Sequence, residues 1–168
     1  AKRVVIVGHG SFALENARHA LENGAAQVTL IARHEALIYP RVVSYAMDSE
    51  HLKHIPDMME AIYKMYRVID YPFDELLKIA KLPFMTMPPS SDVFFLAIAA
   101  GKLKVVRGEV AKLEEHCVVT KEGSEFPADV FIKCLGFQRD TKLDAELMDP
   151  GSGNIEEQWI MDFVDEDN

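Results

Sequence analysis

Two buried-strand patterns flank a helical pattern within the first 31 residues, and this alternation constrains the fold more than any other feature. Residues 4–7 are a continuous β-branched run that ends at Gly8, which is typical of a strand buried on both faces of a parallel sheet. Residues 11–23 place small and apolar side chains at helical spacing, and Gly24 follows as a helix stop. Residues 28–31 repeat the buried-strand pattern. The sequence therefore predicts a right-handed βαβ unit.

The middle of the chain predicts a helical insertion at about residues 46–90. Apolar residues recur at helical intervals over 57–66 and 73–82, and the prolines at 83, 88 and 89 end this pattern. A further helix is predicted over 93–100, with Ser91 as its N-cap. Because this helix is apolar nearly all round, we expect it to be buried, either in this domain or against a neighbour.

The second half of the chain predicts closely spaced strands joined by short turns. They are expected at residues 104–107, 110–113, 117–120 and 130–134. The predicted fold class is α/β, with a Rossmann-like parallel sheet, a β-meander as its last crossover and a helical insertion. We expect the dinucleotide-binding domain to span residues 1–140 and an acidic tail to occupy residues 141–168.

The turn after the first strand has the spacing Gly8-x-Gly10-x-x-Ala13. In a strand-turn-helix context the first glycine makes the tight turn, the second lets the backbone approach a pyrophosphate, and the small third residue permits close helix packing. The amides that begin the helix would bind the phosphates. The alternative is a glycine turn that binds nothing. The candidate cofactor-binding residues here are Gly8, His9, Gly10, Ser11, Phe12 and Ala13.

The end of the second strand decides between the two pyridine nucleotides. NAD-binding domains place an acidic residue there to hold the ribose 2′-hydroxyl, but this chain has Arg33. A guanidinium makes charge-assisted bonds to a 2′-phosphate, which favours NADP; the alternative is a solvated arginine. Glu35 would support NAD, although it lies past the expected place. Arg41 is a second candidate phosphate ligand.

Together with these motifs, the closing segment at residues 131–140 resembles the NADPH-binding domain of flavin-containing monooxygenases and related two-dinucleotide flavoproteins. The family motif there is A-T-G-[FY], and residues 134–137 of this chain keep its last two positions. The resemblance covers residues 2–140. It implies a Rossmann-like fold, NADP(H) binding, and a contribution to the cofactor site from Leu135 and Gly136.

The resemblance also implies that hydride passes from NADPH to a flavin. No second glycine-rich strand-turn-helix unit occurs in the sequence, so FAD is expected only from another domain or a partner subunit, and no catalytic residue is assigned. The alternative hypothesis is a non-catalytic assembly subunit. It would dock through the Met- and aromatic-rich insertion and the acidic tail.

Composition excludes several other classes. The formal net charge of −9 repels phosphate backbones and anionic lipid, so nucleic acid and membrane surfaces are poor partners. No apolar run reaches the roughly 20 residues that span a bilayer. Cys117 and Cys134 are expected to be reduced thiols of a soluble intracellular protein, in the cytoplasm or an organelle matrix. His51 and His54 are not in an H-E-x-x-H motif, so no metal site is predicted.

Overall fold

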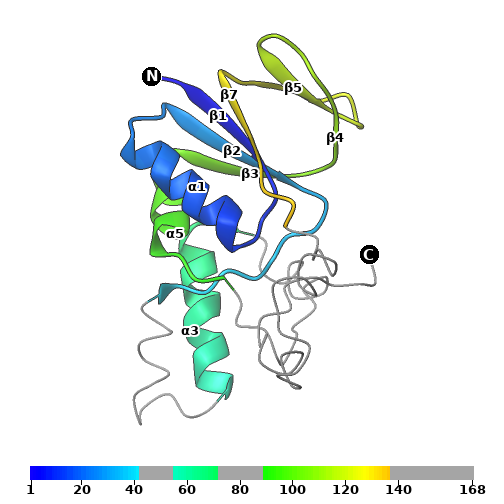
Figure 1. Ribbon diagram of the computed structural model, residues 1–168. Coiled ribbons are helices and arrows are strands. Elements are labelled where there is room, and N and C mark those ends of the chain that lie inside the picture. The colour runs from blue at the N-terminus through cyan, green and yellow to red at the C-terminus, as the bar shows by residue number, and fades with distance from the viewer. Residues whose placement is uncertain (42–54, 72–88, 137–168) are drawn as a thin grey trace, which may run out of the picture. The chain divides into compact units, whose positions relative to one another are not determined.

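The computed structural model describes residues 1–41, 55–71 and 89–136 of the chain, which are coloured in Figure 1. The chain divides into two compact units, Ala1–Cys134 and Leu135–Asn168. The fold described below is that of the first unit. The expected domain boundary near residue 140 lies outside the described residues and stays a prediction.

Four parallel strands form the central sheet: β1 (Arg3–Val7), β2 (Gln27–Ala32), β3 (Leu103–Arg107) and β7 (Val130–Lys133). Their order is β3-β2-β1-β7, so β1 is central and the chain crosses the sheet in both directions from it. Val4 pairs with Val28 on one side and with Val130 on the other. The predicted α/β fold with a parallel sheet is confirmed.

Three helices, α1 (Ser11–Glu22), α3 (Ile55–Val68) and α5 (Asp92–Ala99), belong to the main hydrophobic core. Figure 1 shows α1 and α5 on the same side of the sheet. The core joins alternate residues of β1 and β2 to the apolar side chains of these helices. Its sheet residues include Val4, Ile6, Val28 and Leu30.

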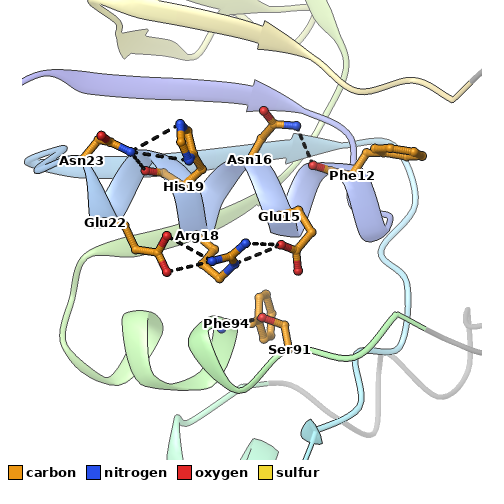
Figure 2. A network of polar contacts seen from close by, with 9 residues as sticks. All are labelled: Phe12, Glu15, Asn16, Arg18, His19, Glu22, Asn23, Ser91 and Phe94. Atoms are coloured by element: carbon orange, nitrogen blue, oxygen red, sulfur yellow. Dashed lines mark hydrogen bonds and ion pairs between the residues drawn. The ribbon is translucent and has the colours of Figure 1, made fainter.

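Helix α5 begins at the predicted cap, because the Phe94 amide donates to Ser91 Oγ at 3.2 Å (Figure 2). Phe94 and Phe95 are buried, whereas Leu96 is 67% exposed. The helix therefore buries one side only in this unit. The apolar sequence predicted a buried helix, in this domain or against a neighbour, but it could not show which side of the helix the other elements of this unit cover.

The opposite face of the sheet is covered by an antiparallel meander of β4 (Val110–Leu113), β5 (Cys117–Thr120) and β6 (Glu125–Pro127). Val118 of this meander packs with Val5 and Ile31 in a second core cluster. The meander lies between β3 and β7 in the chain, which confirms the predicted crossover. The three-residue strand β6 was not predicted, because it is short and ends at a proline.

The helical insertion is confirmed at α3, which contains the predicted helix at residues 57–66. The second predicted helix at residues 73–82, the histidines at 51 and 54, and the tail at 141–168 all lie outside the described residues. Within the described ranges, no helix is long and apolar enough to cross a membrane. Those same ranges contain no group of three or more side chains that could hold a metal ion.

Candidate dinucleotide-binding site

The glycine turn lies at the carboxyl end of β1, between the ends of β2 and β7. The Gly8 amide donates to the Ile31 carbonyl at 2.9 Å, and the Cys134 amide donates to the Val7 carbonyl at 2.8 Å. From β1 the chain first builds the sheet on one side, through β2 and β3, and then returns to add β7 on the other side, so the strand order reverses at β1. In open α/β sheets ligands bind at this reversal point, outside the carboxyl ends of the strands.

Gly8 and Gly10 are required for different physical reasons. Gly8 has φ of +122°, and a Cβ built on it would lie 2.1 Å from the Cys134 carbonyl oxygen, so no other residue fits. Gly10 has an ordinary φ of −92°, and a Cβ built on it would meet nothing within 4 Å. Gly8 thus lets the turn pack against β7, while Gly10 leaves the backbone open to an approaching group.

Helix α1 presents an N-terminus suited to an anion. Its N-cap is Gly10, which supplies no side-chain acceptor, and its first turn contains no acidic residue. Ser11 and Phe12 are exposed at this end, whereas Ala13 is fully buried against the sheet. The first-turn amides carry the positive end of the helix dipole. A phosphate placed here would meet oriented N–H groups.

The charged side chains of α1 lie farther along the helix. Arg18 pairs with Glu15 at 2.7 Å and with Glu22 at 2.9 Å, as Figure 2 shows. The Asn16 side-chain amide donates to the Phe12 carbonyl at 2.8 Å. Because Glu15 and Glu22 are both paired with Arg18, their charge is partly neutralised, which weakens their repulsion of an anion at the preceding turn.

The middle residue of the turn, His9, is buried rather than presented at the surface. Its Nδ1 accepts from the Ala36 amide at 2.9 Å, and its ring meets Phe94 edge to face at 5.6 Å. Burial lowers the pKa of His9 to about 4, so the ring is neutral near pH 7. Since Nδ1 accepts, the proton is on Nε2, which has no hydrogen-bond partner among the described residues. The side chain links the turn to the segment after β2.

Arg33 directly follows β2 and its side chain is exposed. The neighbouring β3 end is fixed beside it, because the Gly108 amide donates to the Ala32 carbonyl at 2.9 Å. The next residue, Glu109, is bonded to Lys121 at 2.9 Å. That bond lowers the pKa of Glu109, and the Arg33 charge adds a smaller effect in the same direction. The guanidinium is therefore at the same edge of the sheet as the glycine turn.

The remaining predicted cofactor-binding residues are Arg41, Leu135 and Gly136. The Arg41 amide donates to Asp92 Oδ1 at 2.7 Å, so this arginine lies beside the start of α5. Leu135 and Gly136 belong to the second unit, where Leu135 is 62% exposed and Gly136 has φ of +85°. A role for these three residues in cofactor binding stays a prediction.

Two tyrosines that the sequence did not single out hold the segment after β2. The Tyr71 hydroxyl donates to Glu35 Oε2. The Tyr66 hydroxyl accepts from the Ile38 amide at 2.7 Å and donates to the Ile38 carbonyl at 3.0 Å. The only sequence signal is that both tyrosines are in the aromatic-rich insertion, because these contacts join residues 28 and 36 positions apart.

Solved structures with a similar fold include chains of cyclohexanone monooxygenase. A cyclohexanone monooxygenase mutant from Rhodococcus sp. Phi1 bound to NADP+ is 14% identical with a TM-score of 0.59, over 82% of this chain and 40% of that one. A cyclohexanone-bound cyclohexanone monooxygenase is 12% identical with a TM-score of 0.59, over 85% and 41%. This chain thus spans about two fifths of their length. At these identities the likeness shows the fold alone.

No curated protein sequence matches the chain. A family model described as "Putative NAD(P)-binding" matches residues 1–124, which include the glycine turn, β2 and Arg33. The parallel sheet, the turn at its reversal point and this match agree. The chain belongs to this NAD(P)-binding family.

Proposed function

We propose that this chain binds NADP(H) at the carboxyl edge of its parallel sheet. The observation that carries the proposal is the glycine turn, in which Gly8 packs on the Cys134 carbonyl while Gly10 stays open at a helix N-terminus that has no side-chain cap. The pyrophosphate would be held by the backbone from Gly10 to Ala13. This arrangement provides phosphate binding through N–H groups and the helix dipole.

The choice of NADP over NAD is assigned to Arg33. Its exposed guanidinium follows β2 at the position where the adenine ribose is read in dinucleotide-binding domains. A 2′-phosphate offers it charge-assisted hydrogen bonds, which a 2′-hydroxyl cannot match. The one nearby acid in this segment, Glu35, is bonded by Tyr71.

The wider proposal is that the chain is the pyridine-nucleotide domain of a flavin-dependent oxidoreductase of the monooxygenase type. It is supported by the fold shared with cyclohexanone monooxygenase, one structure of which is bound to NADP+. When bound, NADPH supplies a hydride, and this chain's residues hold and orient its phosphates. The hydride acceptor would be a flavin bound by an FAD-binding domain or another protein subunit.

The test compares the two nucleotides on one protein. Isothermal titration of the purified chain should give a Kd for NADPH at least about tenfold below that for NADH, as expected from a bond worth about 1.5–3 kcal/mol to a charged group. Arg33→Ala should remove most of this preference. Arg67→Ala, which changes an exposed arginine at the end of α3, is the matched control and should keep it.

Equal affinity for NADPH and NADH in the unmodified chain would overturn the assignment to NADP. If a folded chain bound neither nucleotide, binding itself would be excluded, and the assembly-subunit hypothesis would become the better account. A full preference that survived in Arg33→Ala would move the 2′-phosphate contact to another residue, with Arg41 the next to test.

A further inference from the structure

The segment that follows β2 is fixed by three side chains from distant parts of the chain. His9 accepts from the Ala36 amide, Tyr66 bonds both main-chain groups of Ile38, and Tyr71 bonds the Glu35 carboxylate. Two of these side chains come from α3 and the turn that follows it. The helical insertion therefore fixes the segment that contains Arg33.

These side chains form one aromatic cluster. The centroid of the Tyr71 ring lies 5.4 Å from that of the Tyr66 ring and 6.1 Å from that of the Phe94 ring, and both pairs pack edge to face. Phe94 in turn meets His9 at 5.6 Å. Contacts of this kind restrict ring orientation beyond simple apolar burial. The Tyr71 hydroxyl is thus held in place by packing and is not a freely moving surface group.

The Tyr71 hydroxyl stays protonated and can therefore donate its hydrogen bond over the whole physiological pH range. Burial, and then the neighbouring Glu35, raise the pKa of Tyr71 well above its ordinary range, so the phenol keeps its proton at all physiological pH values. Glu35 is only half-buried and accepts this bond with one of its oxygens. A bond between a phenol and a carboxyl group is among the stronger hydrogen bonds.

The bond between Tyr71 and Glu35 affects which charged side chain a bound nucleotide would meet at its ribose 2′ position. An acidic side chain after the second strand binds the ribose 2′-hydroxyl of NAD and repels the 2′-phosphate of NADP. Glu35 is two residues after Arg33 and is the acid available for that role in the described part of this segment. Its side chain, however, bonds into the aromatic cluster, whereas Arg33 is exposed.

We propose that Tyr71 is a positioning residue for cofactor specificity, which holds Glu35 in the aromatic cluster so that the 2′-phosphate meets Arg33 and not the Glu35 carboxylate. The inference rests on the proposed NADP(H) binding. It assigns a function to the insertion: the residues between β2 and β3 select the nucleotide, although the turn that binds its pyrophosphate is elsewhere.

The experiment is a double-mutant cycle read out as the ratio of the NADH and NADPH dissociation constants. Tyr71→Phe keeps the ring but frees Glu35, so NADPH should bind more weakly and NADH more tightly, and the ratio should fall by roughly tenfold. Tyr71→Phe combined with Glu35→Gln should restore the ratio, because no free carboxylate then remains. Tyr66→Phe is the matched control: it removes the hydroxyl that bonds Ile38 in the same segment but leaves the bond from Tyr71 to Glu35 in place, so it should change the ratio far less than Tyr71→Phe.

A second variant guards against loss of folding in Tyr71→Phe. Glu35→Asp shortens the acid by one methylene, which weakens its bond to Tyr71, and should lower the ratio in the same direction. The proposal is overturned if Tyr71→Phe leaves the ratio unchanged, if the fall persists in the double variant, or if a folded Glu35→Asp keeps the full ratio. In each of these cases the unmodified chain still prefers NADPH, so the proposed function stands. If the unmodified chain binds neither nucleotide, both proposals fall together.

Discussion

The glycine turn and the segment after β2 lie at the same edge of the sheet, but they are built in different ways. The turn is fixed by backbone: Gly8 bonds the Ile31 carbonyl and packs on the Cys134 carbonyl. The segment after β2 is fixed by side chains, chiefly those of His9, Tyr66 and Tyr71. A turn fixed by backbone needs few particular residues, whereas the segment depends on each side chain that holds it.

In the proposed function, this difference separates the two parts of nucleotide recognition. Phosphate binding uses N–H groups and a helix dipole, which any sequence with the right glycines provides. Discrimination between NADP and NAD uses individual charges, whose positions depend on long-range contacts. Substitutions in the turn should therefore abolish folding or binding, and substitutions around the segment should alter preference or pH dependence.

The largest effect is expected from Gly8→Ala. The new Cβ would lie 2.1 Å from the Cys134 carbonyl oxygen at a φ of +122°, so β7 must move away from β1. Backbone strain and overpacking together should reduce the free energy of unfolding by about 3 kcal/mol or more, measured by urea unfolding. A stable Gly8→Ala variant with unchanged nucleotide affinity would contradict the idea that backbone packing builds the turn.

The next effect concerns His9, which links the two regions. Its pKa is lowered to about 4 in the folded chain from an ordinary value of 6.5. The unfolded chain therefore takes up a proton first, so the contribution is complete above about pH 6.5 and is lost as the pH falls to about 4. The loss should reach about 3 kcal/mol, seen by urea unfolding at a series of pH values.

His9→Gln should flatten this part of the pH profile, and His34→Gln, which changes an exposed histidine, should not. Asp129 also loses stabilisation in acid, because the Arg3 guanidinium bonded to it holds its pKa well below its usual range, but this loss is common to all three proteins and cancels when their profiles are compared. Equal slopes for the unmodified chain and His9→Gln between pH 6.5 and 4 would show that the histidine is not buried in neutral form.

The smallest effect on stability is expected from Gly10→Ala. This variant distinguishes blocked access of the nucleotide to the backbone from a loss of folding. A Cβ at Gly10 meets nothing within 4 Å, and φ is −92°, so the fold should lose only about 1 kcal/mol through the poorer N-cap. The methyl group would occupy the space through which a pyrophosphate approaches. NADPH affinity should therefore fall by about tenfold or more, while urea unfolding should show only the small loss of stability expected from the N-cap. Unchanged affinity would place the phosphates elsewhere.

Much of the fold could be predicted because its signals are local. The β-branched runs of β1 and β2, the helical spacing of α1 and the Ser91 cap of α5 each act within a few residues. The meander could be predicted from its closely spaced strands. Strand β6 could not, because three residues carry too little pattern.

The site was only partly predictable for the same reason. The tight turn at Gly8 and the open backbone at Gly10 follow from their spacing after a buried strand, and the position of Arg33 follows from the end of β2. That these residues bind a nucleotide stays a prediction. The burial of His9 and the bond from Tyr71 to Glu35 do not, since these contacts join residues 27 and 36 positions apart. A sequence pattern shows that Tyr71 is aromatic but not which loop its hydroxyl reaches.

The central claim is that NADP(H) binds at the glycine turn with its 2′-phosphate at Arg33, and an amide NMR titration with NADP+ tests it most directly. The account predicts that the largest chemical-shift changes fall on the amides of Gly10, Ser11 and Phe12, with a second group at Arg33 that is absent when NAD+ is used. A titration in which the turn amides do not move, or in which NAD+ and NADP+ give the same pattern at Arg33, would contradict it.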